Sequence, residues 1–134
     1  MLSDKELLDT FKLEIINARQ LILTFLKTLS QNDQDRLAKL VVASVLEIFN
    51  KNPNTTFNLL IDVTALKFLP TAITKNATDT YKGFSKNTQL HKAAIVGAGL
   101  LFKVATIFLM PASKRTNLQW FSNKEEALAW LKKN

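Results

Sequence analysis

The stretch Ala93-Ala94-Ile95-Val96 ends in Gly97-Ala98-Gly99 and passes directly into an apolar segment, residues 100–105. A second short strand pattern, residues 117–121, leads into a capped amphipathic segment, residues 122–131. An apolar run that meets glycine and then changes to helical spacing predicts a strand that turns tightly into a helix. The end of the chain therefore reads strand, helix, strand, helix. This is the order of an α/β fold.

The same alternation extends back to the start of the chain. Residues 11–15 alternate apolar and charged side chains, and residues 21–27 resume a strand pattern after a polar break, which predicts an opening hairpin. Residues 57–63 form an apolar run with Asp62 near its end, as in a buried central strand. The remaining expected strands are residues 92–97 and 116–121, and the expected helices begin at Ser30, Pro70, Gly99 and Ser122.

Local signals support the helix boundaries. Ser30 with Asp33 is a weak capping box, and Ser122 with Glu125 is a full S-x-x-E capping box. Pro53 and its neighbouring asparagines end the first long helix, because proline cannot continue the hydrogen-bond ladder. We expect one α/β domain over residues 1–134, with the order ββαβαβαβα, a mixed sheet of about five strands and about four flanking helices.

Composition excludes several kinds of site. The 134 residues include no cysteine and a single histidine, His91, so disulfides, thiolate chemistry and histidine-based metal sites are not expected. No apolar stretch approaches the roughly 20 residues that a membrane-spanning helix needs. The polar start, Met1 to Glu6, is unlike a secretory signal. We expect a soluble, cytoplasmic, bacterial protein without a cofactor.

The net charge of +7 is unevenly distributed. Residues 1–66 hold 7 basic and 8 acidic groups, whereas residues 67–134 hold 11 basic and 3 acidic groups. Such asymmetry can indicate a polyanion or an anionic membrane surface as partner. The basic residues are mostly isolated lysines, without the aromatic interleaving that favours base stacking. This pattern favours a lysine-covered soluble surface, and we do not expect nucleic-acid binding.

Three motifs together resemble a known family. They are the strand Leu59-Leu60-Ile61-Asp62, the strand Ala94-Ile95-Val96-Gly97 and the closing segment Phe121-Ser122-x-x-Glu125-Glu126-Ala127-Leu128-Ala129-Trp130-Leu131. In this order they resemble the SpoIIAA-like branch of the STAS/Sec14-type fold. The resemblance covers about residues 11–132. It implies regulation by partner switching, in which a partner kinase phosphorylates a serine within an Asp-Ser-x-Gly motif at the start of a helix.

The matching stretch in this sequence is Pro70-Thr71-Ala72-Ile73. Thr71 keeps a hydroxyl at the serine position, but Pro70 replaces the aspartate and Ile73 replaces the glycine. Phosphate at a helix amino end is favoured by the helix dipole. The resemblance therefore makes Thr71 a candidate phospho-acceptor. The alternative is an ordinary residue of the first helical turn.

Other candidate sites have simpler interpretations. Gly97-x-Gly99 lacks the third glycine of a dinucleotide-binding turn, because Phe102 occupies that position. Asp62 lies where α/β proteins often place functional groups, but no second carboxylate or histidine is fixed beside it. It more simply caps the turn into Thr64. His91 is interpreted as a surface loop residue. We therefore do not expect an enzyme, and we expect no catalytic, cofactor or metal site.

The helix expected over residues 99–111 is apolar on nearly all sides. Its candidate contact surface consists of Leu101, Phe102, Ala105, Phe108 and Leu109. An apolar helix must be covered on both sides. A homodimer contact is the favoured cover. The chain's own elements, or a lipid or other apolar ligand, are the alternatives.

The sequence thus predicts a non-catalytic regulatory or protein-interaction module of the SpoIIAA-like type. It is expected to be homodimeric through residues 99–111 and to bind an unidentified protein partner. The runner-up is a binder of lipid or another small apolar ligand, held between helices 70–86 and 99–111. A third reading is salt-sensitive polyanion binding. It would use Lys75, Lys82, Lys86, Lys92 and Lys103.

Overall fold

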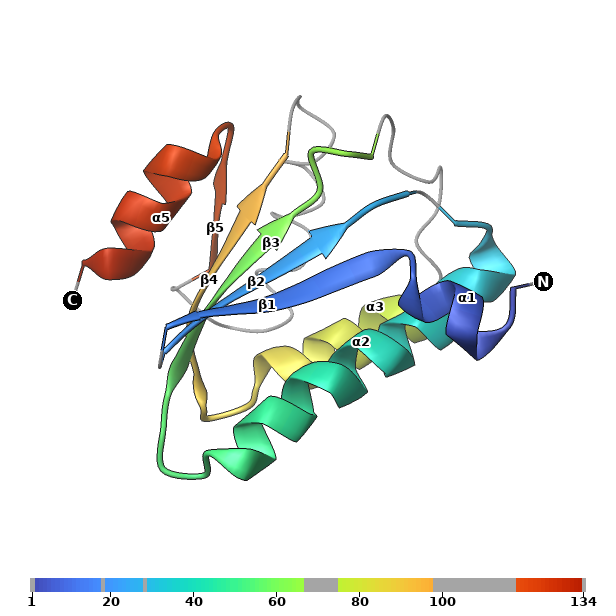
Figure 1. The fold of residues 1–134 in the computed structure, drawn as a ribbon, viewed down its shortest axis with the longest axis horizontal. Coiled ribbons are helices and arrows are strands. Elements are labelled where there is room, and N and C mark those ends of the chain that lie inside the picture. The colour runs from blue at the N-terminus through green and yellow to red at the C-terminus, as the bar shows by residue number, and fades with distance from the viewer. Residues whose placement is uncertain (1, 18, 28, 67–74, 98–117, 134) are drawn as a thin grey trace.

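The computed structural model describes residues 2–17, 19–27, 29–66, 75–97 and 118–133. These residues form a five-stranded sheet with helices on both faces (Figure 1). The strands are β1 (Phe11–Asn17), β2 (Gln20–Phe25), β3 (Phe57–Asp62), β4 (Leu90–Val96) and β5 (Leu118–Phe121). The helices among the described residues are α1 (Asp4–Leu8), α2 (Gln31–Lys51), α3 (Lys75–Ser85) and α5 (Lys124–Lys132).

The strands lie in chain order, β1-β2-β3-β4-β5. β1 pairs with β2 in antiparallel fashion through a tight hairpin, and each later strand pairs in parallel with the one before it. Parallel neighbours need a long crossover, and α2 supplies the one between β2 and β3. The predicted mixed α/β sheet and opening hairpin are confirmed. The helix expected from Gly99 lies outside the described residues.

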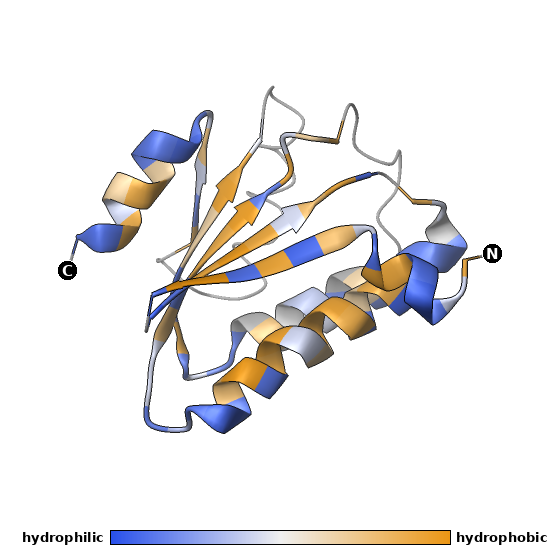
Figure 2. Ribbon diagram, viewed as in Figure 1, coloured by the Kyte–Doolittle hydropathy of each residue, from blue (hydrophilic) through white to orange (hydrophobic). Residues whose placement is uncertain are grey.

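The two faces of the sheet are covered by different helices. In Figure 1, α2 and α3 lie on one face and α5 lies on the other. Figure 2 shows β2, β3 and β4 as largely hydrophobic arrows, whereas β1 alternates. Successive side chains of a strand point to opposite faces, so a strand covered on both faces is apolar throughout. The nearly continuous apolar sequences of β3 and β4 follow from this requirement.

The larger core lies between the sheet and helices α2 and α3. Phe49 of α2 is fully buried, and its ring stacks on Phe57 of β3 at a centroid distance of 5.1 Å and on Phe84 of α3 at 5.8 Å. Leu21 and Leu59 extend this core along the sheet. The aromatic stack therefore connects both helices to the central strand.

The second core lies beneath α5. Ala127 and Leu131 of α5 are buried against Ile22, Leu60 and Ala94, which come from three adjacent strands. The small side chains at 94 and 127 allow the helix to approach the sheet closely. A short helix is thereby held across β2, β3 and β4. No helix of the described residues is long and apolar enough to span a membrane.

The capping of two helices differs from the sequence prediction. Asn123, rather than Ser122, is the N-cap of α5, and its Oδ1 accepts a hydrogen bond from the Glu126 backbone N–H at 2.8 Å. Ser30 is the N-cap of α2 as predicted, but its side chain makes no capping bond and instead donates to Asp33 Oδ2 at 3.3 Å. Both asparagine and serine favour N-caps, so adjacent candidates cannot be ranked from sequence.

Helix α1 has no counterpart among the predicted elements. Its signal is a capping box in which Ser3 Oγ accepts from the Glu6 N–H and Glu6 Oε1 accepts from the Ser3 N–H. The second of these bonds is the largest cause that lowers the pKa of the Glu6 carboxyl below its usual range. The S-x-x-E pattern at residues 3–6 was therefore a readable signal. Only Leu7 and Leu8 follow it as apolar residues, so helical periodicity adds no second signal at this position.

We expect Phe49→Ala to destabilise the fold by about 3–5 kcal/mol, because it removes a fully buried ring and leaves a cavity between two helices and the sheet. The measurement is equilibrium urea unfolding. Glu47→Ala, at an exposed position on the same helix, is the control and should change stability by about 0.5 kcal/mol or less. Similar effects of the two substitutions would contradict the described core.

We expect Asn123→Ala to cost about 1 kcal/mol of stability, because it removes the side-chain acceptor that caps α5. Ser122→Ala is the matched control one residue earlier and should be neutral within about 0.5 kcal/mol. Thermal unfolding of the two variants compares them directly. A larger loss of stability for Ser122→Ala than for Asn123→Ala would contradict Asn123 as the N-cap and support the capping box predicted at Ser122.

Candidate functional site

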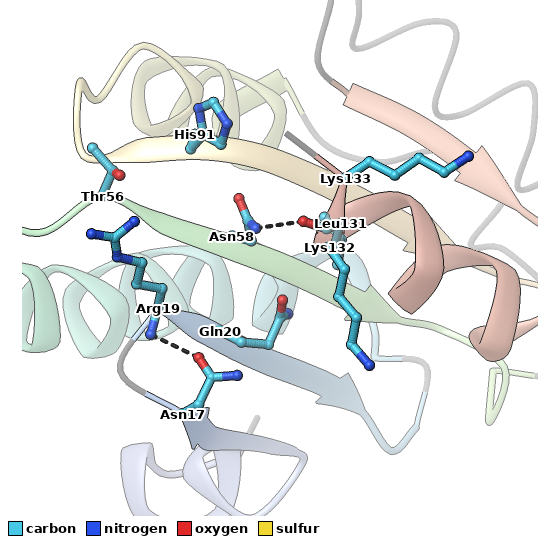
Figure 3. Close-up of a pocket in the computed structure, with 9 residues that line it drawn as sticks. All are labelled: Asn17, Arg19, Gln20, Thr56, Asn58, His91, Leu131, Lys132 and Lys133. Carbon is cyan, nitrogen blue, oxygen red and sulfur yellow. Dashed lines mark hydrogen bonds between the residues drawn. The ribbon is translucent and has the colours of Figure 1, made fainter.

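A pocket of about 430 Å³ lies beside the amino ends of the parallel strands. The β1–β2 turn, the beginnings of β2, β3 and β4, and the carboxyl end of α5 surround it (Figure 3). Its lining is polar and basic. The lining residues are Asn17, Arg19, Gln20, Thr56, Asn58, His91, Leu131, Lys132 and Lys133.

Two irregularities in the sheet shape this edge. The register between β3 and β4 shifts after the Phe57–Leu90 pair, so that Asn58 lies opposite Lys92 and His91 is the extra residue. The β1–β2 register shifts between Ile15 and Asn17. Such bulges redirect side chains and end regular pairing. The bulge in β4 leaves the His91 side chain exposed at the pocket and points Lys92 toward α5.

Asn58 forms the floor of the pocket. Its backbone N–H donates to the Arg19 carbonyl at 2.7 Å, and its Nδ2 donates to the Leu131 carbonyl at 2.8 Å. These bonds connect the hairpin turn and the end of α5 to the central strand. The Oδ1 atom of Asn58 is buried and has no hydrogen-bond partner among the described residues. A buried acceptor without a donor is costly to the folded state, so this end of β3 carries a local cost to stability.

Lys92 neutralises the carboxyl end of α5. Its Nζ donates to the carbonyl of Trp130 at 3.2 Å and to the carbonyl of Lys133, and it lies 5.0 Å from the centroid of the Trp130 ring. A cation at a helix carboxyl end is favoured by the helix dipole, and one above an indole ring gains cation–π attraction. Lys92 thus anchors α5. It is not a free lysine for polyanion binding.

The pocket has a positive character. Arg19, Lys132 and Lys133 line it, and the described residues of its lining include no aspartate or glutamate. The ion pairs found among the described residues involve other cations, namely Lys12, Arg36 and Lys51. The arrangement can attract an anion and offer it hydrogen-bond donors. Among the described residues there is no cluster of three histidine, cysteine or acidic side chains that could hold a metal ion.

The sequence-predicted site residues lie apart from this pocket or outside the described residues. Asp62 Oδ1 accepts from the Thr64 N–H at 2.9 Å and the Thr64 hydroxyl at 2.6 Å, so it caps the turn as predicted. Gly97 is buried at the end of β4 and donates to the Phe121 carbonyl at 3.2 Å. His91 belongs to β4 rather than to a loop.

Most of the remaining candidates cannot be placed. Thr71 and the apolar surface Leu101, Phe102, Ala105, Phe108 and Leu109 lie outside the described residues, as does Lys103. The homodimer through residues 99–111 and the apolar ligand site between helices 70–86 and 99–111 therefore stay predictions. Lys75 and Lys86 are exposed at the two ends of α3.

Sequence reasoning missed Arg19, Asn58 and Lys132. Each has an ordinary local explanation, as a turn residue, a strand residue and the last residue of a terminal helix. The readable signal was Asn58, a polar side chain in the apolar run of residues 57–63. A buried polar residue needs partners, and those partners come from segments far away in the chain.

Comparison with solved structures establishes the fold. A crystal structure of an uncharacterised protein of the DUF3478 family from Shewanella loihica PV-4, described as having a SpoIIAA-like fold, superposes with a TM-score of 0.58. The identity is 23%, and the match covers 90% of this chain and 91% of that chain. No family model matches the sequence, and no curated protein matches it. The protein has a SpoIIAA-like α/β fold, as the sequence motifs predicted.

We expect Lys92→Met to lower stability by about 1–2 kcal/mol, because two helix carbonyls and the Trp130 ring lose their cation while the aliphatic stem is kept. Lys132→Met, at an exposed position of α5, is the control and should stay within about 0.5 kcal/mol. Urea unfolding followed by tryptophan fluorescence reports on both. Equal stability of the two variants would show that Lys92 does not anchor α5.

Proposed function

We propose that this domain is a non-catalytic regulatory or protein-interaction module that works as a homodimer in the cytoplasm. The observation that carries the proposal is the open edge of β1, which is exposed, partly apolar and complementary to itself in charge. The SpoIIAA-like fold supports a regulatory role only by likeness. The contact surface expected at residues 99–111 is a separate prediction. The β1 edge is a different contact surface, and all of its residues are described.

The hydrogen-bonding phase of β1 directs its odd-numbered residues outward. The Leu26 N–H donates to the Thr10 carbonyl at 2.9 Å, so the carbonyl of Thr10 points toward β2. Backbone groups of an antiparallel strand alternate in direction with every residue. Lys12 and Glu14 therefore bond to β2, whereas Phe11, Leu13 and Ile15 present their N–H and C=O groups at the edge. An unpaired edge of this kind is a template for another strand.

The usable edge is short and has a definite centre. Regular pairing with β2 runs from Phe11 to Ile15, and the register shift beyond Ile15 ends it. An isologous contact places a two-fold axis at the middle of the shared segment. The axis falls at Leu13, so that Leu13 of each copy exchanges both backbone hydrogen bonds with the other. Phe11 then lies opposite Ile15 of the second copy.

Charge selects the same register. Lys12 and Glu14 project on one face with their charged groups 3.9 Å apart. An axis at Leu13 places each Lys12 opposite Glu14 of the second copy, twice over. Axes at Lys12 or Glu14 would instead place like charges directly opposite each other, which destabilises a strand pair. The proposed dimer therefore satisfies backbone bonding, strand length and charge in one arrangement.

The exposed apolar side chains need such a cover. Ile15 is 60% exposed and Ile16 is 53% exposed, although neither is a loop residue. Natural proteins protect free edges with charge, bulges or partners because exposed apolar edges aggregate. Pairing across Leu13 would bring Ile15 against Phe11 of the second copy. The result would be one continuous sheet with β1 of each copy at its centre.

Charge reversal tests this dimer. We expect Lys12→Glu alone and Glu14→Lys alone each to weaken self-association roughly tenfold or more, since two favourable cross-strand pairs become two repulsive ones. The double variant Lys12→Glu/Glu14→Lys should restore it, because the opposite charges meet again in the same register. Sedimentation velocity over a range of protein concentrations measures each affinity.

Mixing the two single variants provides the matched control. Each variant should associate weakly with itself, but the two together should form a heterodimer as tight as the natural homodimer. A monomeric natural protein at all concentrations would contradict the proposed function as a homodimer. If neither charge reversal weakens the dimer but Phe102→Lys abolishes it, the contact lies at the surface predicted at residues 99–111 and not at β1.

A further inference from the structure

Helix α1 lies beside the start of β1, in contact with β1 and with α2 (Figure 1). Its Leu7 is fully buried in the larger core. The Arg36 guanidinium of α2 holds the helix in place by donating to Asp4 Oδ1. The preceding residue of α2, Asp35, instead accepts from Asn76 of α3 at 3.3 Å. Successive residues of a helix point about 100° apart, so α1 and α3 lie on different flanks of α2.

Exposed apolar side chains gather at the two ends of β1. Among the described residues, the large apolar side chains with high exposure are Leu8, Ile15, Ile16 and Leu26. Leu8 is the last residue of α1, and the Leu26 N–H donates to the carbonyl of Thr10, just before β1 begins. Ile15 and Ile16 lie near the end of the strand. Single exposed leucines are ordinary, but a cluster around one free strand edge indicates a contact surface.

Ile15 points to the same side of the sheet as α1. Phe11 and Leu13 belong to the core beneath α2, and side chains two residues apart on a strand share a face. Ile15 therefore projects on the α2 side of the sheet. Leu7 packs in the same core, which places α1 on this side as well.

We propose that α1 is the second part of the homodimer contact, and that Leu8 of each copy packs against Ile15 of the other. This inference rests on the homodimer proposed above. An antiparallel pair centred on Leu13 brings the end of β1 in one copy to the start of β1 in the other, with Ile15 beside Phe11. A two-fold axis perpendicular to the sheet keeps the α2 sides of both copies on one face. Because α1 directly precedes β1 on that face, its exposed leucine lies where Ile15 of the second copy arrives.

The size of the strand edge supports this second contact. The regular edge spans only residues 11–15, whereas specific and stable protein interfaces bury roughly 1,200 Å² or more in total. Contact through α1 adds apolar area at both ends of the paired strands, because the two-fold axis repeats it. Burial of two leucines and two isoleucines that are exposed in a single copy stabilises the dimer.

Lysine substitution of two equally exposed leucines tests the contact. We expect Leu8→Lys to weaken self-association roughly tenfold in sedimentation velocity, because a charge replaces an apolar contact that forms twice in each dimer. Leu26→Lys is the matched control and should not change the affinity. Leu26 is 46% exposed, against 47% for Leu8, but it lies on the β2 side of Thr10. Lysine is a good helix former and suits the last turn of a helix, so Leu8→Lys should keep the fold of each copy.

A mixture of two variants identifies the other side of the contact. Ile15→Glu should also associate weakly with itself. Mixed with Leu8→Lys, it should form a heterodimer roughly tenfold tighter than either variant forms alone. The heterodimer keeps one natural contact between Leu8 and Ile15 and places the new lysine opposite the new glutamate at the other.

The outcomes distinguish this inference from the homodimer itself. If Lys12→Glu weakens self-association but Leu8→Lys does not, the strands pair as proposed and α1 lies outside the contact, which overturns this inference alone. Equal losses in Leu8→Lys and Leu26→Lys would show a general effect of added charge and would also overturn it. A natural protein that stays monomeric at all concentrations would overturn both the homodimer and the α1 contact.

Discussion

Parallel pairing of β2, β3 and β4 is the constraint on which the structure depends. Parallel strands cannot be joined by tight turns, so each pairing requires a crossover, and the crossovers cover the sheet. Helices α2 and α3 cover one face, and α5 covers the other. Each face then needs its own apolar core. Phe49 belongs to the core on the α2 and α3 side, and Leu60 belongs to the core beneath α5. The near-continuous apolar sequences of β3 and β4 are the direct consequence.

The same constraint explains where polar groups gather. At the amino ends of the parallel strands the two cores end, and backbone and side-chain groups must find partners there. Asn58 and Lys92 bond to the carbonyls of α5, which hold the short helix across three strands. One buried acceptor, Asn58 Oδ1, has no hydrogen-bond partner in the part of the chain that the structure describes. The pocket is therefore a by-product of joining a terminal helix to the start of a parallel sheet.

The antiparallel strand β1 stands outside this double cover. It pairs with β2 only, and its outer edge is the end of the sheet. Its alternation of apolar and charged residues suits a strand with one covered face, as Figure 2 shows. Its exposed isoleucines and its Lys12–Glu14 pair are not needed by the core. These residues are therefore available to specify a second strand.

The predicted elements and the observed ones agree where periodicity is strong and disagree at the ends. The opening hairpin, β3 and α2 appear within a few residues of their predicted positions. The N-cap of α5 is Asn123 and not Ser122, the residue predicted from sequence. Both side chains can accept a hydrogen bond from a backbone N–H, so only the backbone conformation decides between them. His91 lies in β4 and not in the predicted loop, because it is the extra residue at a shift in the β3–β4 register, which a sequence pattern does not reveal.

The sequence by itself determined the α/β class, the strand order along the chain and the SpoIIAA-like resemblance, because burial on two faces imposes apolar runs and capped helices that can be read locally. Tertiary structure alone decided which polar residues meet. Arg19, Asn58 and Lys132 lie far apart in the chain and share no local pattern, so only the parallel pairing of the strands and the docking of α5 bring them to one pocket. The phase of the β1 edge likewise depends on its bonds to β2, which no residue of β1 encodes alone.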